Sequence, residues 1–174
     1  MKSTILYIFI FITNLSLAQN YHVFNENDWT GKWKGSLKIL YPSKVQDVPM
    51  LLEISRTDAP GKYIWFSKYG EGSTTLSKEY IMEVKEESKG SWILDEGNTI
   101  LIDMYYTDNC FYSSFEVQKS ILNTSYRLEG GKLCFEVLSS KSDSPNITGK
   151  NEGELSEVKS YPVYVVQRAV LIKE

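Results

Sequence analysis

Ten short segments in which apolar and polar residues alternate are the feature that most constrains this 174-residue chain. Alternation with a period of two sends successive side chains to opposite faces of a β-strand. Turn-forming residues such as Gly130-Gly131 separate the segments, and no stretch with the 3.6-residue period of a helix lies between them. The sequence therefore predicts ten strands, at residues 33–40, 48–55, 62–68, 79–85, 91–94, 99–105, 111–117, 122–128, 132–138 and 161–172.

Strands joined by such short turns pair as antiparallel hairpins. A meander of ten strands exposes two long edges unless the sheet closes on itself or folds into a sandwich. We favour closure, and predict an all-β chain that forms a closed antiparallel up-and-down barrel of about 8–10 strands. Residues 139–160, rich in Ser, Asn, Gly and Lys, indicate a long loop or flap before the last strand.

The amino terminus has the pattern of an export signal. Lys2 precedes the apolar stretch 5–12, and Ser16-Leu17-Ala18 supplies small residues at the positions that signal peptidase recognises. This pattern predicts a signal peptide at 1–18, a single β-barrel domain at 19–174, and a secreted or periplasmic protein. The apolar stretch is too short for the roughly 30 Å core of a bilayer, so we expect no membrane span after cleavage.

The charge of the chain argues against a nucleic-acid partner. The chain has 19 basic and 22 acidic residues, and losing Lys2 with the signal peptide changes the formal net charge from −3 to −4. Acidic and basic residues are interspersed, and no cluster of Lys or Arg forms the electrostatic footprint that phosphate binding needs.

The sequence offers little for catalysis or metal binding. Its one histidine, His22, lies just after the expected cleavage site, so a Ser-His-Asp centre lacks its base and a His-based zinc site lacks its ligands. Asp95-Glu96 is the most suggestive carboxylate pair, but the sequence Asp-Glu-Gly-Asn also suits a tight turn. We therefore expect no catalytic residue, no metal and no cofactor, while an enzyme that uses carboxylates or tyrosines stays an alternative.

Two cysteines in an exported chain raise the question of a disulfide. Strand parity sends Cys110 and Cys134 to the outer face, with one strand between them. Two strand spacings are about 9.5 Å, beyond the roughly 7 Å that a disulfide spans between Cα atoms. A bulge at Cys110 would relax this limit, so the disulfide stays open. Asn123 and Asn146 fit the glycosylation pattern, which matters only if the host glycosylates.

Gly31-x-Trp33 at the start of the first strand, together with Arg168 in the last, resembles the calycin superfamily of lipocalins, fatty-acid-binding proteins and avidins. In lipocalins the Trp of this motif closes the floor of the barrel, and an Arg or Lys from the last strand packs across it. The resemblance implies that Gly31, Trp33 and Arg168 close this barrel, with the Arg168 guanidinium over the Trp33 ring. The ten strands and the absence of a helix before the last strand depart from lipocalins, and Trp33 as an ordinary core residue is the alternative.

The same parity that points Trp33 inward brings other aromatic residues to the inner face. In the third strand two faces are aromatic, and we favour Tyr63 and Trp65 inside because Lys62 and Lys68 are then outside. The predicted ligand-binding residues are Tyr63, Trp65, Tyr80, Phe115, Tyr126 and Phe135. They suit a small apolar or amphipathic ligand in the lumen, and they suit a filled core equally well.

The competing interpretation is a protein-interaction or inhibitor module on a filled lipocalin-like barrel. Its protein partner would contact the loop 139–160 and exposed aromatic residues such as Trp29. A ligand carrier requires a connected interior void, whereas an interaction module requires a filled barrel with an apolar outer patch.

Overall fold

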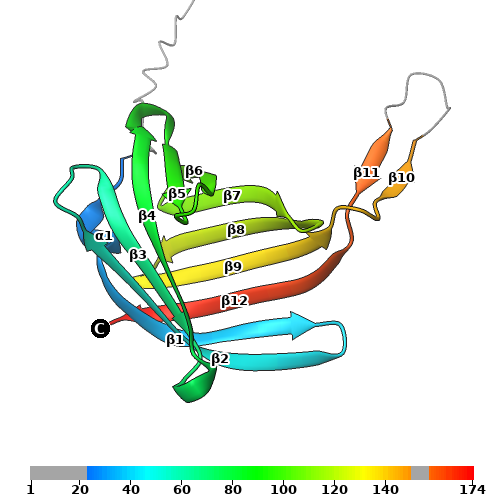
Figure 1. Ribbon diagram of the computed structural model, residues 1–174, viewed down its shortest axis with the longest axis horizontal. Coiled ribbons are helices and arrows are strands. Elements are labelled where there is room, and N and C mark those ends of the chain that lie inside the picture. The colour runs from blue at the N-terminus through cyan, green and yellow to red at the C-terminus, as the bar shows by residue number, and fades with distance from the viewer. Residues whose placement is uncertain (1–22, 150–156) are drawn as a thin grey trace, which may run out of the picture.

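The computed structural model describes residues 23–149 and 157–174. Ten strands form a closed antiparallel barrel, in which each strand lies beside its neighbour in sequence and the first pairs with the last (Figure 1). The prediction of an all-β, closed antiparallel barrel is confirmed, and all ten expected strands are present. They are β1 (Gly31–Tyr41), β2 (Lys44–Arg56), β3 (Lys62–Tyr69), β4 (Leu76–Glu86), β5 (Ser91–Asp95), β6 (Leu101–Thr107), β7 (Cys110–Val117), β8 (Ser120–Glu129), β9 (Lys132–Lys141) and β12 (Val163–Lys173).

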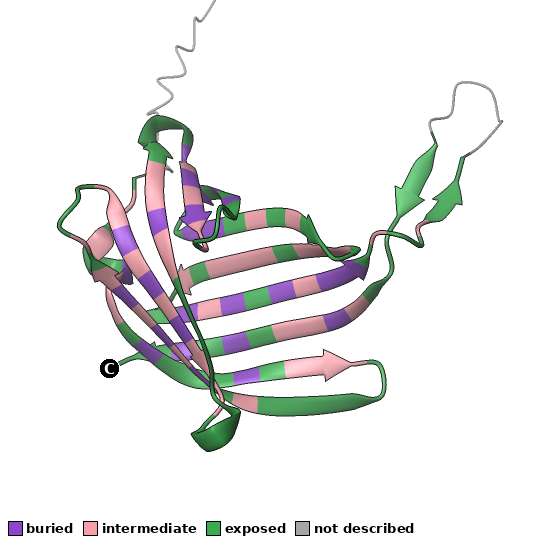
Figure 2. Ribbon diagram, in the orientation of Figure 1, coloured by how far each residue is buried: buried purple, intermediate pink, exposed green. Residues whose placement is uncertain are grey.

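Burial alternates along the strands as the sequence predicts (Figure 2). In β1, Trp33 and Leu37 are buried while Lys34 and Lys38 are exposed. In β3, both Tyr63 and Trp65 are buried, which confirms the choice between its two aromatic faces. The barrel interior is therefore the core, because each strand places its apolar set on that side.

The segment before β1 closes one end of the barrel. It forms the single-turn helix α1 (Glu26–Trp29), with the Asn25 side chain accepting a hydrogen bond from the backbone of Asn27. Trp29 is fully buried, and its carbonyl accepts a hydrogen bond of 2.8 Å from Trp33 Nε1. The expectation that Trp29 is an exposed contact residue is wrong, because the segment folds back and the indole joins the aromatic core.

The region 139–160 is also different from the expected loop. β9 continues to Lys141, with Ser139 and Ser140 buried. Beyond it, β10 (Asn146–Thr148) and β11 (Val158–Ser160) pair as a two-stranded antiparallel sheet that projects away from the barrel (Figure 1). The described part of this region is therefore a β-ribbon at the rim and does not form a flap over the barrel end.

Short 3₁₀ helices η1 (Gly72–Thr74) and η2 (Glu87–Lys89) connect β3 to β4 and β4 to β5. Among the described residues no helix has the length and apolar character to span a bilayer. The expected signal peptide 1–18, its cleavage site and His22 lie outside the described residues.

Candidate ligand cavity

The end of the barrel beside α1 is filled by aromatic side chains. Phe24 packs edge-on to Trp92 with ring centroids 4.9 Å apart, and Trp29 packs edge-on to Phe111 at the same separation. Tyr106 lies 4.7 Å from Phe111 and completes the cluster. Edge-to-face and tilted packing at these distances is favourable, so the described rings pack this half of the interior as an aromatic core.

The other half of the barrel is hollow. A cavity of about 790 Å³ lies there, within the roughly 300–1,000 Å³ range of small-molecule sites. Most of its wall is apolar, and the charged side chains among the described lining residues are Lys78, Glu96 and Glu116. The apolar wall residues include Leu37, Ile39, Val48, Leu94, Ile102, Met104, Phe115, Leu122, Phe135 and Val137.

The structure divides the six predicted ligand-binding residues between the two halves. Four of them line the cavity: Tyr80, Phe115, Tyr126 and Phe135. Tyr63 and Trp65 also point inward, but they belong to the filled half. The Tyr63 hydroxyl donates a hydrogen bond of 3.0 Å to Glu26 Oε2, and the Trp65 ring packs edge-on to Tyr126 at 5.0 Å. Parity assigns a residue to the inner face but carries no information about its height along the barrel axis.

The cavity-wall residues that β5 and β6 contribute were not predicted from the sequence. Leu94, Ile102 and Met104 line the cavity and are buried. Both strands were expected, but their inner face was not assigned. The signal was present, since Leu94 alternates with Ile93 and Asp95 in the same way as residues of the other strands.

The two strands β6 and β7 separate along one side of the cavity. Their pairing is limited to three residue pairs, from Tyr105↔Tyr112 to Thr107↔Cys110, at the end beside α1. Beyond these pairs the strands diverge, and residues on both sides of the gap line the cavity. Ile100, Leu101 and Val117 are exposed here, so an apolar rim surrounds this side of the cavity.

Polar groups of the cavity form three arrangements. On the wall, Ser113 Oγ and Thr124 Oγ1 share a hydrogen bond of 2.5 Å. At the rim, Lys78 Nζ lies 4.0 Å from Glu96 Oε2. Deeper inside, burial raises the pKa of Tyr126 well above its ordinary value and also raises the pKa of Tyr80. Both phenols are therefore neutral hydrogen-bond donors near neutral pH.

The predicted closure by Arg168 over Trp33 is wrong. The β1–β12 register pairs Arg168 with Lys38 and Trp33 with Lys173. Lys173 Nζ lies 5.1 Å from the centroid of the Trp33 ring, so Lys173 is the cation of the last strand that packs on the tryptophan. Arg168 is five residues away along β12, about 16 Å at the rise of a strand.

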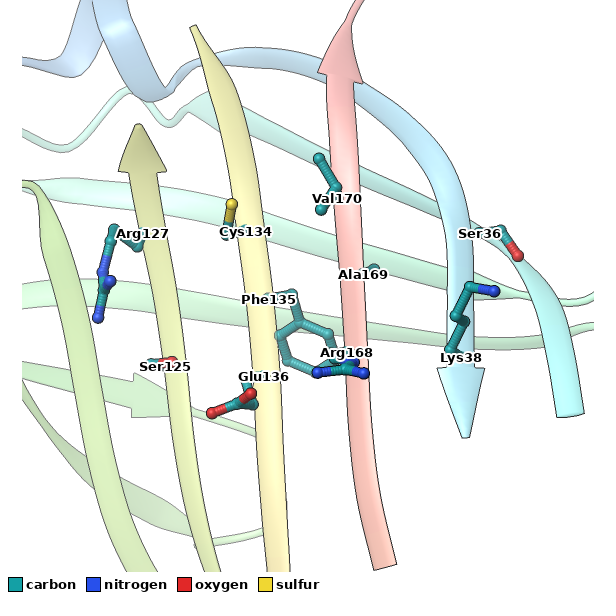
Figure 3. Close-up of a pocket in the computed structure, with 10 residues that line it drawn as sticks. All are labelled: Ser36, Lys38, Ser125, Arg127, Cys134, Phe135, Glu136, Arg168, Ala169 and Val170. Carbon is teal, nitrogen blue, oxygen red and sulfur yellow. The ribbon is translucent and has the colours of Figure 1, made fainter. Parts of the chain in front are cut away.

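Arg168 instead lies on the outer face, in a surface cavity of about 590 Å³ (Figure 3). The side chains around it come from four adjacent strands, β8, β9, β12 and β1. Its exposed charged residues are Lys38, Arg127, Glu136 and Arg168. Among them Lys38 forms an ion pair of 3.6 Å with Asp47.

Both cysteines are free thiols. Cys110 pairs in register with Arg127, and Arg127 pairs with Cys134, so β8 separates the two cysteines as parity predicts. Cys110 is buried and Cys134 is half-buried. The disulfide that the sequence left open is absent here because no bulge shifts Cys110 toward its counterpart.

The described residues contain no group of three or more His, Cys, Asp or Glu side chains that would hold a metal ion. Asp95 serves the tight turn that its sequence suggests, because its Oδ1 accepts a hydrogen bond of 2.7 Å from the backbone of Gly97. This contact favours the turn interpretation of the pair Asp95-Glu96 over an acid–base pair.

Comparison with known proteins gives the fold and no function. Neither a protein family nor a curated protein matches the sequence. A crystal structure of a DUF3598-family protein of unknown function from Nostoc punctiforme matches with a TM-score of 0.61 and 12% identity, over 87% of this chain and 50% of that one. Rv2717c from M. tuberculosis matches with a TM-score of 0.55 and 14% identity, over 86% of this chain and 94% of that one. This chain spans about half the length of the DUF3598 protein, and identities this low show a shared fold alone.

Proposed function

We propose that this barrel binds a small apolar or amphipathic molecule in its hollow half. The observation that carries the proposal is the cavity of about 790 Å³, whose wall is mostly apolar and whose opposite end is sealed by packed aromatic rings. A cavity of this size with few polar groups is the arrangement that small-molecule sites share. The cavity also argues against the filled barrel that the interaction-module interpretation requires.

Two further features belong to the same proposal. The Gly31-x-Trp33 motif, with Lys173 from the last strand on the tryptophan, supports a relationship to the calycin superfamily. The pattern of residues 1–18 supports export to the periplasm or the medium. Amino-terminal sequencing of the exported protein should return Gln19, and a chain that still begins at Met1 would contradict export by cleavage.

Binding is tested with a panel of a fatty acid, a retinoid-like dye and a porphyrin. The Trp65 ring packs on Tyr126, which lines the cavity, so indole emission should change saturably as a ligand fills the space. Ligand that binds only the folded state should also raise the melting temperature. If no member of the panel changes the emission or the melting temperature, the carrier proposal fails.

A matched pair of tryptophan variants locates the site. Phe115→Trp places a larger ring in the cavity wall and should weaken binding about tenfold or more, because the added volume competes with the ligand. Ile172→Trp adds the same ring on the outer face, where the side chain is 60% exposed, and should leave the affinity unchanged. Equal affinities for the two variants would place the ligand outside the lumen.

A protein partner is the second candidate, and the ribbon β10–β11 favours it. Ile147 and Val158 are exposed on the ribbon, which projects from the barrel. Replacing both residues by Ser should abolish the binding of a protein partner identified by co-purification with the wild-type chain. The same change should leave the binding of small ligands unchanged. Capture that survives the double substitution would exclude the ribbon as the contact.

A further inference from the structure

Three tyrosine side chains from opposite sides of the barrel line the same cavity. Tyr69 on β3 and Tyr80 on β4 lie on neighbouring strands, and Tyr126 on β8 lies across the lumen. Of the charged lining residues, Lys78 lies opposite Ser67 in the β3–β4 register, between Tyr80 and the strand end that carries Tyr69, and Glu96 directly follows β5. The three phenols interact with one another, so they form one polar cluster in a cavity whose wall is otherwise mostly apolar.

Two more buried donors adjoin these phenols. Trp65 and Ser67 are almost fully buried on the lumen face of β3. Neither Trp65 Nε1 nor Ser67 Oγ makes a hydrogen bond of good geometry to another described residue. Trp65 Nε1 lies beside the Tyr126 hydroxyl, and Ser67 lies beside the Tyr69 hydroxyl. Because these two donors face the phenol oxygens, the hydroxyls of Tyr126 and Tyr69 keep their O–H groups to donate to an incoming oxygen acceptor.

The charge balance around the cavity disfavours an anionic acceptor. Lys78 is the one cation among the described lining residues, and it lies 4.0 Å from Glu96. Glu116, on β7 across the gap from β6, adds a second negative charge. A carboxylate that enters the cavity loses its hydration, and no unpaired cation of the described lining residues compensates its charge. Burying an uncompensated charge is strongly unfavourable.

We propose that the cavity selects uncharged molecules with an apolar body and an oxygen acceptor, such as a ketone, ester or alcohol. The oxygen accepts hydrogen bonds from the phenols of Tyr126, Tyr80 and Tyr69. The apolar body of the ligand fills the rest of the cavity. This inference rests on the proposed function, because it assumes that the lumen takes an apolar ligand.

The test uses four ligands with the same chain length: an alkane, a fatty alcohol, a methyl ketone and a fatty acid. At neutral pH the alcohol and the ketone should bind about tenfold more tightly than the alkane. One added hydrogen bond to a buried donor strengthens binding by about this factor. The ionised fatty acid should bind more weakly than the alcohol. Failure of all four ligands to bind would contradict the proposed function itself.

If the ligands bind with equal affinity, or the fatty acid binds most tightly, the cavity takes apolar molecules but the selection for uncharged oxygen acceptors is wrong. The variant Tyr126→Phe should lower the affinity for the alcohol about tenfold and leave that for the alkane unchanged. Tyr112→Phe, which removes a hydroxyl from the outer face, should change neither. If Tyr126→Phe does not fold, Tyr80→Phe provides the same comparison, and an unchanged preference for the alcohol in the folded variant would overturn the assignment of the phenols.

Discussion

Lys173 Nζ lies 5.1 Å from the centroid of the Trp33 ring, at the point where the last strand pairs with the first. The same ammonium donates hydrogen bonds to the carbonyls of Asn27 and Asp28 in α1, at 3.0 and 3.1 Å. Gly31, with φ of +128°, leaves the space that this side chain crosses, since a Cβ there would be 2.8 Å from Lys173 Cε. One lysine therefore joins β1, β12 and α1.

Replacing Lys173 by Ala should lower the free energy of unfolding by about 1–2 kcal/mol, because a cation–π contact and two hydrogen bonds to carbonyls are lost. Arg168→Ala is the matched control, since it removes a cation from the same strand and should cost less than about 0.5 kcal/mol. Urea unfolding measures both. An equal loss for the two variants would contradict the role of Lys173.

Trp33→Ala should lower the free energy of unfolding by about 3–5 kcal/mol, as large-to-small changes in a core do. The side chain is buried, and its Nε1 bonds the Trp29 carbonyl, so the variant leaves both a void and an unpaired acceptor. Trp33→Phe, which keeps most of the volume, should lose less. A loss below about 1 kcal/mol for the alanine variant would place Trp33 outside the stabilising core.

Tyr63 should make the stability depend on pH in the alkaline range. Burial, with the hydrogen bond to Glu26, raises the pKa of Tyr63 from 10.0 to about 12. A raised pKa in the folded state stabilises the fold below the unfolded value, near 10, and this contribution is lost as the pH rises to about 12. The difference in unfolding free energy between wild type and Tyr63→Phe should therefore shrink between these pH values. A difference that stays constant to pH 12 would contradict the shift.

The gap between β6 and β7 should be visible in hydrogen exchange. Beyond Tyr105↔Tyr112 the two strands are not paired, so amides of 101–104 and 113–117 that face the gap lack the protection of a ladder. They should exchange at least about tenfold faster than amides in the β8–β9 ladder, which is continuous from Ser120 to Glu129. Equal protection would show that the strands close in solution.

The strands and their inner faces could be predicted because both depend on local patterns. Alternation decides which side chains enter the core, as for Trp33 and Leu37 in β1, and it also places Tyr80 and Tyr126 inside. Closure was favoured over a sandwich because closure alone removes the edges of a sheet of short hairpins. Strand positions and inner faces need no contact between distant parts of the chain, whereas closure is completed by the pairing of β1 with β12.

The position of each residue along the barrel axis depends on tertiary structure. The cation that packs on Trp33 is Lys173, because the β1–β12 register places these two residues opposite each other. The register between two distant strands cannot be derived from the sequence of either strand alone. The same reason separates Tyr63 and Trp65 from the cavity, since their strand crosses the filled half before it reaches the hollow one.

The sequence alone determined ten alternating strands and their inner aromatic face, because a period of two fixes the direction of every side chain relative to its neighbours. Only the tertiary structure decided that Trp29 folds back to seal one end and that β6 separates from β7 beside the other. The physical reason is volume, because whether a lumen is filled or hollow depends on how side chains from all ten strands and α1 pack together in space.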